Sequence, residues 1–475
     1  MARLKEYNGH YCESEYEYAF IGFLEAEGWK YSSGNNIHRV TKRDVLIADD
    51  FKKFIADTNP DLTEDEVTQI YDNVRLVGAE SDFATLHKVY GWMVNGVQFT
   101  PQDELPRMIP LIDFDNWDKN IFRVVNQFTV EYTNNGQKEN RRPDVLLFVN
   151  GMPLCVVELK NPADANATTY DAWEQINIRY WRDIPHLLHY CPLACISDGV
   201  KTRLGTVRTP YEHFYAWRRV NEGDVVSTLP FAETETMIKG VYAPERFLEI
   251  FRDYIYFQDS IYDSDEVEIV CRYPQFFAAR LLKQSIIKSV VEKSGKGGTY
   301  FGATGCGKTY TMAFLARQLA LRCTDIPEIG SPTIILIVDR DELQKQGSKL
   351  FTKSKEFLNL GEVSVVKNRT QLRQELGARQ SGGFYICTIQ KFCDREDDKI
   401  GLINDRQNII CFSDEAHRTQ LEHSKKIQFS KDADENMKAM VSKPYALRYC
   451  SAFAAKYSII DKPSAIISPI IFAAS

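Results

Sequence analysis

The sequence predicts an α/β protein of two domains, the first built on a mixed sheet and the second on a parallel sheet. Apolar β-branched and aromatic runs predict strands at Val124–Tyr132, Asp144–Val149 and Pro153–Leu159, and Asn150-Gly151 between the last two predicts a hairpin. After a glycine-rich stretch, strand-like cores alternate with helical segments. That alternation is typical of a parallel sheet covered on both faces.

The composition is that of a folded protein with several domains. At about 150 residues per domain, 475 residues correspond to roughly three domain equivalents. Hydrophobic residues at 44% and charged residues at 26% exclude a disordered chain. The net charge of -7 excludes a polycation, so any binding to nucleic acid would have to come from local basic patches. The 11 cysteines include no CxxC pair, which indicates reduced core thiols in a cytoplasmic protein.

The first domain is expected to begin with a helix and a strand and to continue through a polar, partly helical segment. A helix over Thr168–Arg182 and a buried strand over Pro192–Ile196 follow the hairpin. No apolar run reaches the about 18 residues that a membrane span needs. We therefore expect no membrane association.

The two regions are separated by a charged, aromatic stretch, roughly Glu222–Glu266, whose apolar residues follow neither helix nor strand spacing. We expect residues 1–235 to form the first domain, 236–265 a connector and 266–475 the second domain. In the second domain, helices are expected over Pro274–Glu292 and from Lys308. Strand cores are expected at Thr333–Val338, Phe384–Thr388 and Ile409–Phe412.

The segment Gly302–Thr309 fits the phosphate-binding pattern GxxxxGK[ST] between a predicted strand and a predicted helix. Its backbone N–H groups would surround phosphate oxygens at a helix N-terminus. Lys308 would reach the β- and γ-phosphates of ATP, and the Thr309 hydroxyl would hold Mg²⁺. This context disfavours the alternative, a glycine-rich turn without a ligand. The assigned loop residues are Thr304, Gly305, Cys306, Gly307, Lys308 and Thr309.

A buried strand about a hundred residues later ends in Asp414-Glu415-Ala416-His417. Two carboxylates there could serve ATP hydrolysis, with Asp414 holding Mg²⁺ and Glu415 polarising the attacking water. The alternative, a solvated helix start, is disfavoured by the phosphate loop upstream. The region resembles superfamily 2 helicases and translocases of the DEAH-box kind, and the resemblance implies that Gln275 reads the adenine edge.

A second group of charged residues lies in the first domain, at the ends of the hairpin strands. Glu158 and Lys160 are two apart in a strand and share a face, while Asp144 begins the partner strand. With Arg142 and Pro143 they resemble the PD-(D/E)xK nuclease core. The resemblance implies that Asp144 and Glu158 bind Mg²⁺ and that Lys160 orients or deprotonates the attacking water. A solvated strand edge is the alternative, and the apolar surroundings argue against it.

The hairpin constrains this assignment. A plain two-residue turn at Asn150-Gly151 would place Asp144 opposite Val157, on the other face from Glu158. Shared metal binding therefore predicts an odd-length loop, a bulge or a strand-end twist. The nuclease resemblance also implies an extra acid on the first helix, for which we select Glu17.

The segments 141–151, 153–162, 180–185 and 196–199, followed by the DEAH region, resemble the R (restriction and motor) subunit of type I restriction enzymes. A QxxxY element of that family has one extra residue here, between Gln175 and Tyr180, so the role of Gln175 stays open. Basic residues near the carboxylates are the expected DNA contacts, although solvated surface arginines would look the same. The selected contacts are Arg141, Arg142, Arg179, Tyr180 and Arg182.

The resemblance implies a nuclease and ATP-dependent translocating subunit that cuts double-stranded DNA with Mg²⁺, beside methylation and specificity subunits. The alternative is an ATP-dependent helicase or remodeller whose first domain only binds DNA. No second motor lobe is recognisable in the sequence. We therefore expect the chain to be a fragment or a frame-disrupted product that binds nucleotide weakly and does not translocate. The apolar tail would be exposed on a lone lobe.

Overall fold

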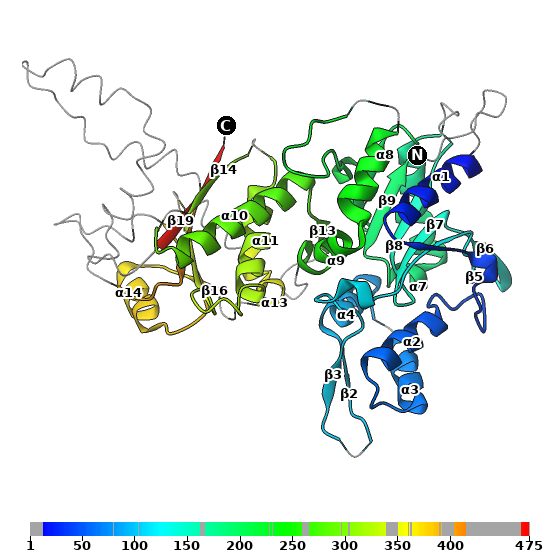
Figure 1. Ribbon diagram of the computed structural model, residues 1–475, viewed down its shortest axis with the longest axis horizontal. Helices are drawn as coiled ribbons and strands as arrows, with labels where there is room; N and C mark the ends of the chain where they lie inside the picture. Colours follow the sequence, from blue (N-terminus) through cyan, green and yellow to red (C-terminus); the bar gives the residue numbers. More distant parts are fainter. Residues whose placement is uncertain are drawn as a thin grey trace, which may run out of the picture. The chain divides into compact units, whose positions relative to one another are not determined.

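The computed structural model describes the chain as two units, shown in Figure 1. One unit comprises Met1–Phe257 and Glu266–Tyr273, and the other comprises Gln258–Asp265 and Pro274–Ser475. The residues that the structure describes are 13–78, 80–102, 104–161, 167–227, 229, 231–258, 266–295, 297–302, 305–338, 350–359, 361, 363–388, 391, 403–414 and 467–474.

A seven-stranded mixed sheet of order β1-β4-β7-β8-β9-β10-β11 forms the centre of the first unit. The pairs β1/β4 and β8/β9 are parallel, and the remaining neighbours are antiparallel. Every residue of β7 and β8 is buried, as expected for central strands covered on both faces. The strands are β1 (Lys30–Ser33), β4 (Phe122–Asn126), β7 (Val145–Val149), β8 (Met152–Leu159), β9 (Leu193–Ser197), β10 (Thr202–Thr206) and β11 (Tyr215–Ala216).

Three two-stranded ribbons and several helices complete this unit. The ribbons pair β2 (Val97–Phe99) with β3 (Arg107–Ile109), β5 (Val130–Asn134) with β6 (Gln137–Arg141), and β12 (Ile255–Phe257) with β13 (Glu268–Val270). The α-helices are α1 (Glu13–Ala26), α2 (Ala48–Thr58), α3 (Glu64–Arg75), α4 (Asp82–Asn95), α5 (Thr169–Glu174), α6 (Trp181–Asp183), α7 (Pro185–Leu188), α8 (Ala232–Met237) and α9 (Pro244–Asp253). Two π-helical segments are η3 (Gln175–Tyr180) and η5 (Ile238–Tyr242).

The turn between β7 and β8 contacts the segment that leads into α2. The N–H of Ile47 donates to the carbonyl of Gly151 at 2.8 Å. Gly151 has a φ of 76°, and a Cβ there would lie 2.2 Å from the Ile47 carbonyl oxygen, so only glycine fits. The helices α2 and α3 and the β2–β3 ribbon extend beyond this end of the sheet in Figure 1.

Two sequence expectations differ from the structure in this unit. The single strand expected over Val124–Tyr132 is divided into β4 and β5 at Gln127, whose φ of 54° interrupts the extended backbone. The expected connector does not behave as one segment: residues 236–257 form helices and a strand whose aromatic side chains are buried within the first unit. The aromatic residues in this segment do not follow the spacing of one helix or strand, so the sequence does not reveal its short packed elements.

The second unit contains a six-stranded sheet of order β14-β19-β18-β15-β17-β16 in which all neighbours are parallel. This is the RecA-like α/β arrangement expected from the sequence. Its strands are β14 (Gly298–Gly302), β15 (Thr333–Val338), β16 (Val363–Val365), β17 (Phe384–Thr388), β18 (Ile409–Asp414) and β19 (Ile467–Ala474). Its described helices are α10 (Tyr273–Val291), α11 (Lys308–Leu321), α13 (Lys355–Leu358) and α14 (Arg369–Ala378).

The apolar tail has a place in this sheet. Strand β19 pairs with β14 on one side and with β18 on the other. Both backbone edges of Ile467–Ala474 are therefore paired inside the sheet. Within the described ranges, no helix is long and apolar enough to cross a membrane.

Candidate nuclease and nucleotide sites

The candidate metal-binding carboxylates come from β8 and from the residue before β7. Val145 pairs with Val157, but Phe148 pairs with Pro153, so a β-bulge shifts the register between Leu147 and Phe148. The bulge confirms the predicted irregularity in the hairpin. Extending the Val145–Val157 register by one residue places Asp144 opposite Glu158. Proline lacks an N–H group for the ladder, which fits its position at the bulge.

The two carboxylates meet at the edge where β4, β8 and β9 end and β7 and β10 begin. Asp144 Oδ2 accepts a hydrogen bond from the Leu159 N–H at 2.8 Å. Glu158 is 0% exposed, and its Oε1 accepts from the Tyr180 hydroxyl at 2.6 Å. Lys160 Nζ lies 3.9 Å from Glu158 Oε2. The structure thus brings Asp144, Glu158 and Lys160 together.

Gln175 completes a ring of contacts around Glu158. Its Oε1 accepts from Lys160 Nζ at 2.9 Å, and its Nε2 donates to the Tyr180 hydroxyl at 2.8 Å. Both residues lie on η3, a π-helix whose i→i+5 spacing brings residues five apart to the same face. The π-helix therefore accommodates the extra residue of the QxxxY element, and it gives Gln175 a position that the sequence left open.

Burial and like charge dominate the electrostatics of this pair. Burial raises the pKa of Glu158 well above its usual value, the neighbouring Asp144 carboxylate raises it further, and Lys160 opposes the shift. Burial also raises the pKa of Asp144, while the Leu159 N–H lowers it. The pKa of Tyr180 is raised well above its usual value by burial and then by Glu158. Two adjacent carboxyl groups in this environment favour a shared proton or a cation.

One observation tests whether Mg²⁺ fits here. Glu158 Oε2 is buried and has no hydrogen-bond partner in the described part of the chain. A carboxylate oxygen of this kind beside a second carboxylate is a suitable ligand, because Mg²⁺ uses one or two carboxylates plus phosphate oxygens and water. Over the described ranges, no three His, Cys, Asp or Glu side chains form a metal-binding group. The candidate donors in the described part of the chain are therefore the carboxylates of Asp144 and Glu158.

Glu17, selected as the extra acid, lies on α1 and is buried. It contacts side-chain amides, accepting from Asn126 Nδ2 at 2.6 Å and from Gln127 Nε2 at 3.1 Å. Asn126 and Gln127 are neighbours of the site that the sequence analysis missed. The only signal for them was their place at the end of a strand that leads toward Asp144.

The expected DNA contacts are more heavily paired than the sequence suggested. Arg141 Nη2 and Arg182 Nε lie 2.6 and 2.7 Å from the carboxylate of Asp183, and Arg179 pairs with Glu174 at 2.8 Å. Asp183 was also missed, because it lies 42 residues from Arg141 in sequence.

Two members of that set differ sharply in exposure. Arg142 is exposed and has no ion pair with any described residue. Tyr180 is 1% exposed, and its hydroxyl donates to the Glu158 carboxylate. Its selection as a DNA contact is therefore corrected, because the buried side chain contacts Glu158 instead.

The nucleotide loop connects β14 to α11, and α11 begins at Lys308. Gly305 and Gly307 have φ values of 81° and 78°, which glycine adopts readily. Gln275 Nε2 lies 3.2 Å from the carbonyl oxygens of both Cys306 and Gly307, so this side chain contacts the loop itself. Thr309 follows Lys308 in the first turn of α11. Thr304 lies outside the described residues.

Asp414 is the last residue of β18, a strand that pairs with both β15 and β19. It thus ends a central parallel strand of the sheet that also contains β14, the strand before the loop. Ligands of α/β sheets bind beyond the carboxyl ends of such strands. Glu415 lies outside the described residues.

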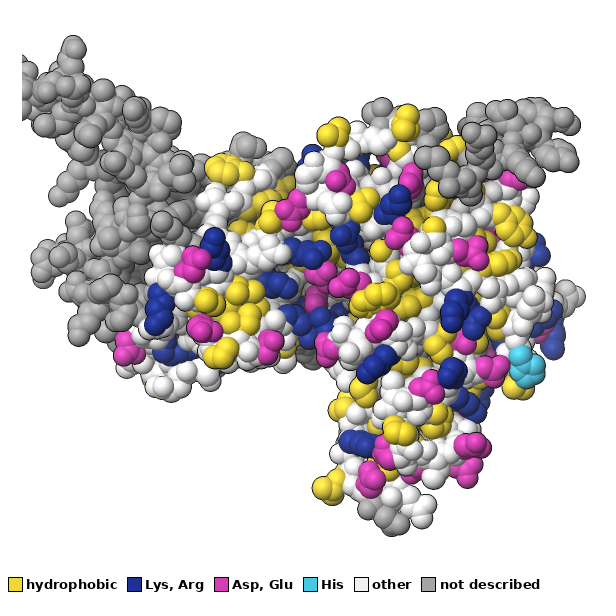
Figure 2. Space-filling view, viewed as in Figure 1, with side chains coloured by type: hydrophobic (Ala, Val, Ile, Leu, Met, Phe, Trp, Pro, Cys, Tyr) yellow, Lys and Arg dark blue, Asp and Glu magenta, His cyan; other side chains and the backbone are white. Residues whose placement is uncertain are grey.

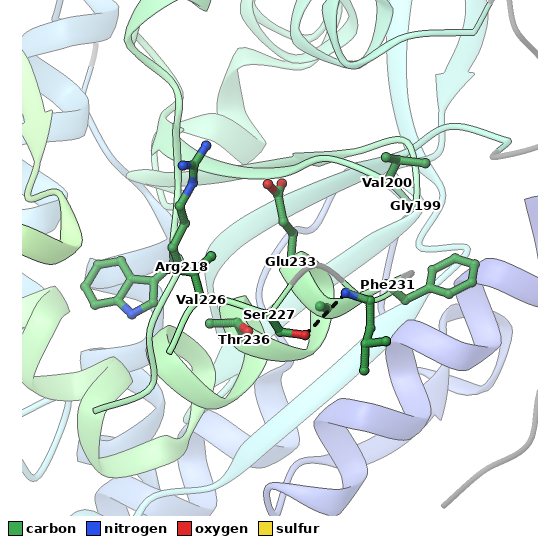
Figure 3. A pocket seen from close by; sticks show the side chains of 11 residues that line it. Gly199, Val200, Arg218, Val226, Ser227, Phe231, Glu233 and Thr236 are labelled. Atoms are coloured by element: carbon green, nitrogen blue, oxygen red, sulfur yellow. Dashed lines mark hydrogen bonds between the residues drawn. The ribbon is translucent and has the colours of Figure 1, made fainter. Parts of the chain in front are cut away.

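A separate cavity of about 530 Å³ lies beside the β9–β10 turn (Figure 3). Gly199 and Val200 of the turn and Phe231 line it, together with the charged side chains of Arg218 and Glu233. The Glu233 carboxylate accepts from the Thr202 N–H at 3.1 Å. Among its described lining residues are none of the candidate nuclease or nucleotide residues, so the cavity belongs to neither site.

Two family models match this chain, one over each of its two regions. Residues 11–213 match the family model described as type I restriction enzyme R protein N terminus, and residues 274–449 match the SWI2/SNF2 ATPase model. Over its first region the chain is similar to the type I restriction enzyme R subunits. Its parts are a PD-(D/E)xK nuclease fold followed by a RecA-like ATPase fold.

Named R-subunit relatives align with most of this chain. It is 31% identical over 437 residues to the type I restriction enzyme HindI endonuclease subunit of Haemophilus influenzae, covering 88% of this chain and 40% of that protein. It is 30% identical over 433 residues to a putative type I restriction enzyme MjaIXP endonuclease subunit of Methanocaldococcus jannaschii, covering 85% and 39%. The chain therefore spans about two fifths of the length of these curated relatives.

A solved fragment of a putative HsdR subunit from Vibrio vulnificus YJ016 aligns with 76% of this chain and 52% of that chain. The identity is 13% and the TM-score is 0.22.

Proposed function

We propose that the chain provides the nuclease and the first ATPase lobe of a type I restriction enzyme. In this proposal the assembled enzyme cleaves double-stranded DNA with Mg²⁺ after ATP-driven translocation, together with methylation and specificity subunits. The convergence of Asp144, Glu158 and Lys160 at one edge of the sheet supports it. A helicase with a purely DNA-binding first domain would not need two adjacent buried carboxylates beside a lysine.

The residues of the nuclease site have distinct roles in this proposal. Asp144 and Glu158 would hold Mg²⁺, which when bound polarises the scissile phosphate and a water molecule. The Lys160 ammonium would orient the attacking water and offset negative charge that develops on phosphorus. Gln175 and Tyr180 fix Lys160 and Glu158 through the hydrogen bonds described above. Arg141, Arg142, Arg179 and Arg182 are the basic residues from which DNA contacts would come.

ATP would bind at the loop formed by Thr304, Gly305, Cys306 and Gly307. Lys308 would contact the β- and γ-phosphates, and Thr309 and Asp414 would hold a separate Mg²⁺. Glu415 would activate the hydrolytic water. Gln275 is proposed to read adenine, and its contacts with the loop carbonyls would then link adenine binding to the loop conformation.

Three substitutions separate the two chemistries. Glu158→Ala or Lys160→Ala should abolish plasmid cleavage in the complex assembled with methylation and specificity subunits, while ATP hydrolysis persists. Lys308→Ala should stop both, because translocation precedes cleavage in the proposed mechanism. ATPase and plasmid cleavage are measured side by side, with the exposed Lys201→Ala as the matched lysine control.

The outcomes distinguish the candidate functions. Absence of cleavage in every form, including the unsubstituted chain, would favour the helicase alternative. Loss of ATP hydrolysis in correctly folded Glu158→Ala would contradict two separate sites. Unchanged ATP affinity in Lys308→Ala would contradict the nucleotide assignment.

A further inference from the structure

The backbone at the end of β4 adopts a conformation that is uncommon for its residue type. Gln127 has a φ of 54°, in the left-handed region, which is unfavourable for a residue with a side chain. Glycine would avoid this cost. A glutamine at this position therefore suggests that its side chain has a use.

That side chain and the preceding one hold Glu17. Gln127 Nε2 donates to both carboxylate oxygens of Glu17, at 3.1 and 3.3 Å, and Asn126 Nδ2 donates to Oε1 at 2.6 Å. Glu17 is 6% and Asn126 2% exposed. The Tyr31 hydroxyl donates to Asn126 Oδ1 at 3.0 Å, which directs the amide nitrogen toward Glu17. The buried carboxylate is thus held by two amides from consecutive residues.

The same bend contacts the nuclease site. The backbone N–H of Gln127 donates to the carbonyl oxygen of Asp144 at 3.3 Å. Gln127 therefore contacts Glu17 through its side chain and the Asp144 peptide through its backbone. On α1, the neighbouring Tyr16 hydroxyl lies 2.6 Å from Ser197 Oγ at the end of β9. Glu17 is consequently fixed relative to the sheet from both sides.

We propose that Asn126 and Gln127 are positioning residues for the nuclease reaction. They hold Glu17 at the edge of the sheet that contains Asp144 and Glu158, but apart from the direct metal ligands. Asp144 and Glu158 would hold Mg²⁺, and Glu17 would help to orient water beside them. The inference rests on the proposed nuclease function. It is supported by the amide contacts and by the lack, in the described chain, of a group of three acids that could share a metal.

The variant Gln127→Gly removes the amide while keeping a residue suited to a positive φ. We expect plasmid cleavage by the assembled complex to fall about 10–100-fold, as for other groups that orient metal ligands. Mn²⁺ affinity of the chain, measured by isothermal titration calorimetry, should change much less. Asp144→Asn should abolish that Mn²⁺ binding. Asn135→Gly is the matched control, because Asn135 also has a positive φ of 49° but lies in the β5–β6 turn.

A double variant tests whether Gln127 acts through Glu17. The combination of Glu17→Gln with Gln127→Gly should cleave no more slowly than Glu17→Gln alone, because coupled residues are non-additive. Additive losses, or unchanged cleavage in Gln127→Gly, would overturn the positioning role. If Gln127→Gly lowers the melting temperature, Gln127→Asn is used instead, since asparagine tolerates a positive φ but is shorter. Absence of Mn²⁺ binding in the unsubstituted chain would instead reject the nuclease proposal itself, and the positioning role with it.

Discussion

At the scale of single residues, the sheet edge that contains Asp144 and Glu158 places charged side chains where they destabilise the fold. Glu158 is completely buried beside Asp144, and one of its oxygens has no hydrogen bond in the described structure. Burying a carboxyl group without full pairing destabilises a fold. The identities of Asp144, Glu158 and Lys160 were predictable from strand ends and spacing. The amides around Glu17 were not, because a left-handed glutamine has no sequence signature.

Replacing Glu158 by glutamine should stabilise the metal-free chain, increasingly so at higher pH. Because the pKa of Glu158 is raised in the folded chain, the folded state binds more protons than the unfolded state as pH rises above the usual glutamate value. The stability of the unsubstituted chain therefore falls as pH rises from the usual glutamate pKa to the raised pKa of Glu158. Glu158→Gln removes this loss of stability. Each kcal/mol gained should raise the melting temperature by about 2–4 °C.

Melting curves at pH 4 and pH 8 without metal measure this effect. The difference between Glu158→Gln and the unsubstituted chain should be small at pH 4 and large at pH 8. Adding Mg²⁺ should stabilise the unsubstituted chain more than the variant, since only the former keeps both carboxylates. A pH-independent difference would show that the carboxyl group does not carry the destabilisation.

At the scale of elements, two local irregularities assemble the site. The bulge between β7 and β8 aligns Asp144 with Glu158, and the π-helix η3 aligns Gln175 with Tyr180. The bulge was predictable, because a regular hairpin would have separated the two carboxylates. The π-helix was not, because its sequence differs little from that of an α-helix. The strands β7, β8, β15, β17 and β18 were predictable from continuous apolar runs, since buried parallel and central strands have that pattern.

The bend at Gln127 lies close to the 3₁₀ helix Gly34–Asn36, which follows β1. A Cβ on Gly34 would lie 2.7 Å from the Gln127 carbonyl oxygen and 2.7 Å from the Phe128 Cα. Gly34→Ala should therefore destabilise the chain by about 1–3 kcal/mol, and it should slow cleavage because the amides of Asn126 and Gln127 shift. Urea unfolding and plasmid cleavage measure the two effects.

Gly91 in α4 provides the matched control, because a Cβ there has no atom within 4 Å. Gly91→Ala should stabilise the chain by about 0.5–1 kcal/mol, as alanine does inside helices. Equal stability of the two variants would contradict the close approach at Gly34.

At the scale of the whole molecule, the charge distribution limits how DNA can bind. The net charge is -7, and basic and acidic side chains are interspersed over the face seen in Figure 2. Phosphate binding must therefore come from arginines whose charge is not already neutralised. The sequence identified the arginines near the carboxylates, but not Asp183, which pairs with two of them. Pairing between residues distant in sequence cannot be derived from composition.

The salt dependence of DNA binding distinguishes paired from unpaired arginines. Arg142→Ala should reduce the slope of log affinity against log salt by about 1, as expected for a lost phosphate contact. Arg141→Ala and Arg182→Ala should each reduce it less, because Asp183 holds both guanidinium groups and they in turn lower its pKa. Asp183→Asn gives the sharpest contrast: removing the shared negative charge should tighten DNA binding and steepen the slope. An unchanged salt slope in Arg142→Ala would exclude Arg142 from the DNA interface. Weaker DNA binding with a shallower salt slope in folded Asp183→Asn would mean that the ion pairs orient the arginines for phosphate instead of competing with it.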